Sequence, residues 1–244
     1  MGSLTRARCL ACFVAGCGLV IFLVLGLAFI PTTSLEGVDD AVKRHRISLL
    51  EKTGAFLLRD AQSQRLAEEA AGGETDPQRR VLKLLDWTVR AVRPMPPGLP
   101  LIDDHILHIV HRHYGNDVQM AEVFTLLTTY TGNHGKFAES ATPGARASVT
   151  LSFVESEDGW WVFNVEHGAW FETEAGRIAT IQDFRHPEHL RRLGRAPDEW
   201  GGVPYLAYFE KVEEVWKRSF SRARGQRPWH RLLMKLGLEQ ADGR

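Results

Sequence analysis

Residues 114–132 read YGNDVQMAEVFTLLTTYTG, and this stretch decides the fold that the sequence predicts. Gly115 and Asn116 are turn residues, and the apolar residues that follow them have a helical spacing. Gly132 is a helix terminator, because glycine readily adopts the left-handed conformation at a helix C-terminus. We therefore predict a helix over residues 117–131 in the middle of the chain, with Asp117 as a capping carboxylate.

The pattern changes directly after this helix. Residues 147–154 and 160–165 alternate and are rich in β-branched and aromatic side chains, as strands are. Residues 155–159 join them and have the composition of a hairpin turn. Further strands are predicted at 170–171 and 177–181. An antiparallel meander that follows a helix, without helices between its strands, predicts an α+β fold.

Helices are predicted on both sides of this core. They span residues 34–71, 77–92, 103–112, 183–193, 203–222 and 227–238. The clearest start is Asp76-Pro77, an N-cap followed by a first-turn proline, and Asp103 or Asp104 is the expected cap of the next helix. The predicted parts are a cytoplasmic tip and anchor at 1–31, a helical stalk or partner segment at 32–76, a core at 77–200 and a C-terminal helical extension at 201–244.

The chain begins with a long uncharged run. From Cys9 to Ile30 there are 22 residues without a charge, enough for a helix to span the hydrocarbon core of a membrane. Arg6 and Arg8 precede the run, whereas acidic residues follow it. By the positive-inside rule we expect a single-pass protein of the inner (plasma) membrane, in contact with lipid through residues 9–30, with a cytoplasmic N-terminus and an extracytoplasmic (periplasmic) body.

Two cleaved forms of this run stay open as alternatives. A signal peptide usually has a shorter apolar region and a small-x-small cleavage site, and the residues before Pro31 offer no small pair. Residues 14–17, Val-Ala-Gly-Cys, are similar to a lipoprotein cleavage motif, although few apolar residues precede them. We therefore favour an uncleaved signal-anchor.

Composition narrows the function classes. Lys and Arg together number 30, as do Asp and Glu, so the formal charge is zero and gives no reason to expect a nucleic-acid partner. All three cysteines, Cys9, Cys12 and Cys17, lie in or at the edge of the uncharged run. The body therefore has neither a thiol nor a disulfide. The sequence also leads us to predict no cofactor.

Four segments together resemble the core of transglutaminase-like domains of the papain superfamily, of the membrane-anchored bacterial type. The first is residues 114–127, in which an aromatic-Gly pair leads into a helix that reads Ala-x-x-Phe-x-x-Leu-Leu. The others are Gly132–Lys136, Asp158–Asn164 and Gly176–Ile181, in the family's order. The resemblance covers about residues 77–185 and implies a central helix packed on an antiparallel sheet.

In that family a cysteine at the start of the central helix, a histidine on the next strand and an Asp or Asn on the following strand catalyse acyl transfer from an amide. By the resemblance the cysteine position falls on Asp117, or on Asn116 if the register slips by one. The histidine position falls within residues 147–150, with Ser148 favoured, and the third position falls on Asn164. Only Asn164 suits its role, so the triad is degenerate and we expect no catalytic residue. The resemblance leaves a ligand-binding role for Asn116, Asp117, Trp160 and Asn164 in the old cleft.

Two histidine-rich stretches are candidates for metal ligands. Residues 105–113 read HILHIVHRH, and residues 186–189 read HPEH. Histidines three apart on a helix can share a metal. No His-Glu-x-x-His motif is present, however, and apolar residues separate the first group while a proline interrupts the second. We therefore predict no metal site.

The C-terminal stretch combines basic and apolar residues. Residues 217–235 contain seven basic residues and no acidic one. One helical face there carries four large apolar residues, which are Trp229, Leu232, Leu233 and Leu236. This composition suits an interfacial amphipathic helix beside anionic lipid, and it equally suits a last helix docked on the core.

These features predict a catalytically inactive binding or scaffolding protein in envelope or cell-surface polymer handling, with a glycan or an envelope protein as partner. The last step rests on the resemblance alone. Two alternatives stay open. One is a hydrolase or acyltransferase with a rearranged, non-cysteine site around Asp117, and the other is an obligate subunit whose residues 34–71 pair with another membrane protein.

Overall fold

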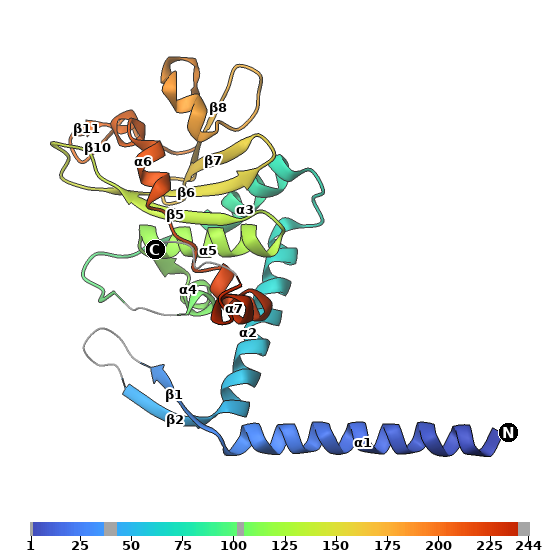
Figure 1. Cartoon of the computed structure of the whole chain (residues 1–244). Coiled ribbons are helices and arrows are strands. Elements are labelled where there is room, and N and C mark those ends of the chain that lie inside the picture. Colours follow the sequence, from blue (N-terminus) through green and yellow to red (C-terminus); the bar gives the residue numbers. More distant parts are fainter. Residues whose placement is uncertain (1, 37–42, 102–104, 239–244) are drawn as a thin grey trace. The chain divides into compact units, whose positions relative to one another are not determined.

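The structure is a computed structural model that describes residues 2–36, 43–101 and 105–238. The chain divides into two compact units, residues 1–58 and 59–244. Helix α2 (Leu49–Ala71) begins in the first unit and ends in the second (Figure 1). Every described hydrophobic side chain that is buried belongs to the second unit. The core therefore lies beyond residue 58.

The first unit is a helix followed by a hairpin. Helix α1 spans Gly2–Phe29, and strands β1 (Pro31–Glu36) and β2 (Lys43–Ser48) pair antiparallel from Pro31 opposite Ser48 to Glu36 opposite Lys43. The Nζ atom of Lys52 donates a 2.7 Å hydrogen bond to the carbonyl of Thr33. The predicted helix over 34–71 is therefore wrong at residues 34–36 and 43–48, which pair as strands. Residues 37–42 of that prediction lie outside the described residues.

Among the residues that the structure describes, no helix has both the length and the apolar character that crossing a membrane requires. The predicted transmembrane helix at residues 9–30 is therefore wrong. Helix α1 begins at Gly2 and takes in Arg6 and Arg8. The prediction rested on a count of uncharged residues, which identifies only a candidate span. The expected cytoplasmic N-terminus and extracytoplasmic body stay predictions.

The second unit is built around a five-stranded antiparallel sheet. Its order is β5-β6-β7-β8-β9. The strands are β5 (Gly135–Ser140), β6 (Val149–Ser156), β7 (Gly159–Asn164), β8 (Ala169–Glu172) and β9 (Arg191–Leu193). The predicted α+β core with an antiparallel meander is confirmed. Residues 177–181 are not a strand, but they contact the sheet through isolated bridges at Ile178 and Thr180 and through backbone hydrogen bonds of Ala179.

Three helices cover one face of the sheet. They are α3 (Pro77–Ala91), α4 (Ile106–Arg112) and α5 (Asp117–Tyr130). Helix α5 packs directly on β5 and β6, and its residues 119–130 are all buried (Figure 1). Helix α3 starts where predicted, since Asp76 accepts a 2.8 Å hydrogen bond from the backbone N–H of Arg79. Asp103 and Asp104 lie outside the described residues.

Short segments cover the other face. They are the 3₁₀ helices η2 (Ile181–Arg185) and η4 (Tyr205–Phe209), together with α6 (Val212–Lys217). The rings of Phe184 and Phe209 stack there at 5.2 Å, and Phe171 of the sheet contacts both. The sheet is therefore buried on both faces, which explains the nearly continuous apolar runs of β6 and β7.

The long helices predicted at 183–193 and 203–222 are wrong. Residues 187–189 form a 3₁₀ turn, η3 (Pro187–His189), and two-residue strands β10 (Glu199–Trp200) and β11 (Val203–Pro204) pair with each other. Prolines and paired glycines account for the breaks, because proline lacks an N–H and Gly201 and Gly202 have positive φ.

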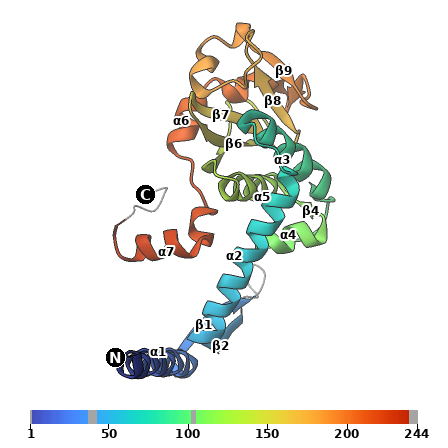
Figure 2. The same cartoon turned by 90° about the vertical axis from the view of Figure 1, so that its right-hand side faces the viewer.

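The described chain ends in two further short elements. These are η5 (Arg224–Gln226) and α7 (Pro228–Lys235), close to the helix predicted at 227–238. Arg222, just before them, donates a 2.5 Å hydrogen bond to the buried carboxylate of Glu122 on α5. In two views at right angles, α7 lies on the far side of α5 from the sheet (Figures 1 and 2).

Candidate functional site

The start of α5 is capped by Asn116. Its side-chain oxygen accepts a 2.9 Å hydrogen bond from the N–H of Gln119, and the Gln119 side chain accepts one of 3.1 Å from the N–H of Asn116. This is a reciprocal capping box. The predicted cap at Asp117 is therefore displaced by one residue. The carboxylate of Asp117, in the first turn, is left to interact with the sheet.

Asp117 meets the second residue of strand β6. The Oγ1 atom of Thr150 donates a 2.6 Å hydrogen bond to Oδ2 of Asp117, and Thr150 is buried. Ser148, the residue predicted at this point, precedes β6 and donates its hydroxyl to Glu139. The strand therefore presents Thr150 to the helix start.

Asn164 ends strand β7 and is fully buried. Its Nδ2 atom donates a 3.2 Å hydrogen bond to the backbone carbonyl of Thr150. Its Oδ1 atom accepts a 3.0 Å bond from the backbone N–H of His167 and lies 2.9 Å from Nδ1 of the same residue. Because Oδ1 is an acceptor, the proton of a neutral imidazole belongs on Nδ1, and Nε2 is left as an acceptor. Asn164 therefore orients a histidine that follows it in the chain.

Glu166 and His167 are half-buried beside Asp117. Burial, together with the negative charge of Asp117, raises the pKa of Glu166 to about 7. Burial also lowers the pKa of His167, and the charge of Asp117 partly opposes that shift. Both shifts have the same main cause, which is that a low-dielectric setting favours the neutral form of an ionisable group.

Aromatic rings from the C-terminal segment close this region. The ring of His167 makes edge-to-face contacts with Trp200 at 4.6 Å and with Tyr205 at 5.6 Å. Tyr205 is fully buried, and its hydroxyl has no hydrogen-bond partner among the described residues. Burial and then the charge of Glu166 raise the pKa of Tyr205. We call the set Asp117, Thr150, Asn164, Glu166 and His167 the helix-start site.

Trp160 lies elsewhere. It pairs with Glu155 at the opposite end of the β6–β7 hairpin, four residues or about 13 Å along the strand from Asn164. Its ring contacts those of His134 at 5.6 Å and Trp216 at 5.8 Å. Of the four predicted binding residues, the structure brings Asp117 and Asn164 together through Thr150, uses Asn116 as a cap, and separates Trp160 from all three.

Sequence reasoning missed Glu166 and His167, and within residues 147–150 it favoured Ser148 over Thr150. The search for a histidine was confined to residues 147–150, in the strand that precedes the one containing Asn164. The imidazole instead comes from the turn after Asn164, three residues further along the chain. The available signal was the local sequence Asn164-Val165-Glu166-His167, in which a side-chain amide can bond a backbone N–H three residues on.

The described residues contain no group of three or more His, Cys, Asp or Glu side chains arranged to hold a metal ion. Within residues 105–113, His105 caps α4 by accepting a 3.3 Å hydrogen bond from the N–H of Leu107. Burial is the main cause that lowers the pKa of His105. His113 ends the same helix in the left-handed conformation, with φ 61°. The roles observed here are structural.

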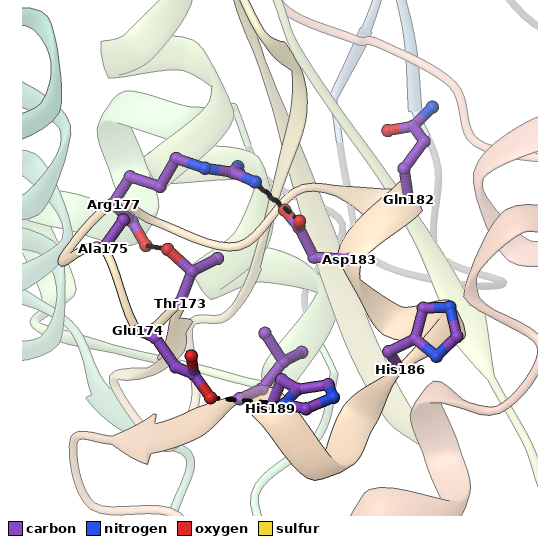
Figure 3. Close-up of a pocket in the computed structure, with 9 residues that line it drawn as sticks. Thr173, Glu174, Ala175, Arg177, Gln182, Asp183, His186 and His189 are labelled. Atoms are coloured by element: carbon purple, nitrogen blue, oxygen red, sulfur yellow. Dashed lines mark hydrogen bonds and ion pairs between the residues drawn. The ribbon is translucent and has the colours of Figure 1, made fainter.

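A separate cavity of about 520 Å³ lies beside η2 and η3. Several of its polar groups are bonded to one another (Figure 3). Arg177 donates hydrogen bonds of 2.9 and 2.6 Å to the two carboxylate oxygens of Asp183, and His189 lies 3.2 Å from Glu174. Burial would raise the pKa of Asp183, but the hydrogen bonds from Arg177 and Thr180 hold it below its usual range. These contacts stabilise the loop after β8.

Two solved structures are similar to this chain. A candidate cysteine protease from Cytophaga hutchinsonii is 14% identical with a TM-score of 0.40, over 55% of this chain and 46% of that one. A candidate protease from Parabacteroides distasonis is 10% identical with a TM-score of 0.36, over 55% of this chain and 35% of that one. This chain thus spans less than half the length of either. These similarities do not assign it to a family.

No model of a known protein family matches the chain, and no curated protein matches it.

Proposed function

We propose that this chain is a non-catalytic binding protein whose helix-start site recognises a cationic group, such as the amine or guanidinium of a peptide or protein partner. The observation that carries the proposal is a pair of half-buried carboxylates. Burial, and then the negative charge of Asp117, raises the pKa of Glu166 to about 7. An acid whose ionised form is disfavoured beside a second carboxylate forms a site that a cation would stabilise.

The absence of a thiol supports binding over acyl transfer. No cysteine follows Cys17 in the sequence, and the position that the resemblance assigns to the nucleophile holds Asp117. That carboxylate already accepts a 2.6 Å hydrogen bond from Thr150. A carboxylate in this setting accepts hydrogen bonds and carries a negative charge. It has no thiol, so it cannot form the thioester on which the cysteine mechanism depends.

Two further groups beside Asp117, the side chains of Glu166 and His167, also act as acceptors. An ionised carboxylate accepts hydrogen bonds only, and the Nε2 atom of a neutral His167 with its proton on Nδ1 is an acceptor as well. A ligand with several N–H donors and a positive charge complements this set. The arrangement favours a peptide or protein partner over a glycan, because Trp160, the aromatic residue among the predicted binding residues, packs against Trp216 and His134.

Calorimetric titration of the full chain with cadaverine tests this proposal, and 1,5-pentanediol is the uncharged control of the same length. We expect saturable binding of the diamine at pH 8 and none of the diol.

Binding of cadaverine should weaken about tenfold at pH 6, because Glu166 with a pKa of about 7 is then largely protonated. Asp117→Asn and Glu166→Gln should each weaken it at least about fivefold, whereas Asp158→Asn in the exposed β6–β7 turn should not. Unchanged binding in Asp117→Asn would refute the proposal.

One observation favours a second candidate, a hydrolase with a rearranged site. Glu166, with a pKa of about 7, lies beside a histidine whose pKa is lowered, so a proton donor and a proton acceptor are both available near neutrality. Assays with p-nitrophenyl esters and p-nitroanilides would distinguish the two candidates. Turnover with a bell-shaped pH profile that disappears in Glu166→Gln would establish the hydrolase and overturn the binding-only function.

A further inference from the structure

Helix α7 presents a row of large apolar side chains to solvent. Trp229 is 67% exposed, Leu232 45% and Leu236, just after the helix, 61%. At 100° per residue these three positions fall within about 60° of one another around the helix. Exposed apolar residues scattered singly need no explanation, but three on one side of one short helix form a surface.

The opposite side of α7 is held against the core. His230, Leu233 and Met234 are half-buried. The guanidinium of Arg227 lies 5.6 Å from the centre of the Tyr130 ring at the end of α5. Just before it, Gln226 contacts Nε2 of His105 at 3.2 Å. The helix is therefore docked on one side, as one of the two alternatives drawn from the sequence expects, while its other side stays exposed.

Charge indicates what could cover the exposed side. The chain carries seven basic and no acidic residues from 217 to 235, and the ion pairs of this stretch include Lys217 with Glu213 and Arg222 with Glu122. Arg231, on the flank of α7, is exposed. A surface with this charge attracts an anionic partner.

We propose that α7 lies in the plane of an anionic lipid surface, with Trp229, Leu232 and Leu236 toward the acyl chains and Arg231 toward the headgroups. A lipid surface supplies both components that this face requires, an apolar layer and a layer of phosphate charge. Tryptophan is also the side chain that favours the boundary between the two. A nucleic acid would match the charge but would leave the leucines unburied. This contact is peripheral and involves no spanning segment, and it is independent of the helix-start site.

Sedimentation of the full chain with vesicles tests the proposal. The vesicles are phosphatidylcholine alone, or phosphatidylcholine with phosphatidylglycerol at about 3:1, in about 0.1 M salt, where charge attraction still acts. We expect tighter binding to the anionic vesicles, reduced at least about tenfold by Leu232→Glu and weakened by added salt. Leu206→Glu is the matched control, because Leu206 is a comparably exposed leucine (42%) in η4, and binding should be unchanged.

A second measurement reports on α7 itself and excludes a contribution from α1. Brominated lipids quench tryptophans that enter the acyl boundary, so the wild-type chain should be quenched and Trp229→Phe should lose that component. Circular dichroism confirms that each variant is folded. Equal vesicle binding by the wild type and Leu232→Glu, equal binding to neutral vesicles, or absence of Trp229 quenching would each overturn the proposal. The proposal would also be overturned if the chain formed a dimer without lipid, or a complex with an acidic protein, and Leu232→Glu dissociated that dimer or complex.

Discussion

Glu166 and His167 are neighbours in the chain, and burial shifts their pKa values in opposite directions, upward for Glu166 and downward for His167. Each shift makes the uncharged form of the group more favourable. Asn164 connects strand β6 to the imidazole, because its Nδ2 atom donates to the carbonyl of Thr150 and its Oδ1 atom lies 2.9 Å from Nδ1 of His167. At this scale the acceptors Glu166 and His167 lie beside the carboxylate of Asp117, to which Thr150 donates.

The raised pKa of Glu166 predicts a pH-dependent stability. Its folded-state pKa of about 7 exceeds the unfolded value of 4.5. Between these pH values the native state holds a proton that the unfolded state has lost, so stability falls as pH rises through that window. Glu166→Gln removes this loss. We expect the free energy of unfolding of this variant to equal that of the wild type near pH 4. At pH 8 it should exceed the wild-type value by about 1–3 kcal/mol, after allowance for solvent screening.

Urea unfolding at the two pH values measures this difference. Glu157→Gln, in the exposed β6–β7 turn, is the control and should show no pH-dependent gain. Equal stability of Glu166→Gln and the wild type at pH 8 would contradict the assigned pKa.

At the scale of elements, helix α5 determines where the site lies. The capping box at Asn116 starts the helix one residue before Asp117. At the other end the chain turns back tightly, so that β5 packs on the same helix at Gly135. The first feature directs Asp117 toward Thr150, and the second sets the distance between helix and sheet.

Asn116→Ala should lower the free energy of unfolding by about 1 kcal/mol, because it removes the side-chain acceptor for the N–H of Gln119. Asn116→Ser retains an acceptor and should cost at most a few tenths of a kcal/mol. Urea unfolding of both variants measures the difference. If serine and alanine cost the same, the cap is not what stabilises this helix start.

Gly135→Ala should destabilise the fold by about 1–3 kcal/mol through overpacking. A Cβ atom there would lie 2.6 Å from Oγ1 of Thr128 and 2.9 Å from Cα of Thr125, so the helix would have to move away from β5. Gly225→Ala is the control, because a Cβ at Gly225 meets nothing within 4 Å. Thermal unfolding should separate the two, and equal melting temperatures would show that helix and strand are not in close contact.

At the scale of the whole molecule, the second unit contains every described buried hydrophobic side chain, from Ala67 onward. Its sheet has one apolar cluster on each face, one with α3, α4 and α5 and the other with η2, η4 and α6. The first unit adds no described side chain to either cluster. Its contribution to the stability of the core is therefore expected to be small.

Removal of residues 1–48 should leave the unfolding of the second unit unchanged within about 0.5 kcal/mol, because no buried contact of its core is lost. Tryptophan fluorescence suits this measurement, since all seven tryptophans lie beyond residue 58. A large loss of stability would show that the first unit supports the core.

The sequence by itself determined the central helix, the hairpin after it, the start of α3 and the absence of a thiol from the body. These depend on local periodicity, on caps and on residue identity, all of which are present within a few consecutive residues. The same local rules failed for the β1–β2 hairpin, which was predicted to be helical. They also failed for the uncharged run at 9–30, where the prediction rested on a count of uncharged residues and not on a periodic pattern.

Only the tertiary structure decided which side chains meet. The register of β6 on β7 places Asn164 beside the start of β6, while the four residues of strand between Asn164 and Trp160 carry the latter away. Thr150 bonds to Asp117 across 33 residues of sequence, and Tyr205 contacts His167 from a segment about 40 residues further along the chain. Such contacts follow from the packing of distant segments, which no local pattern encodes.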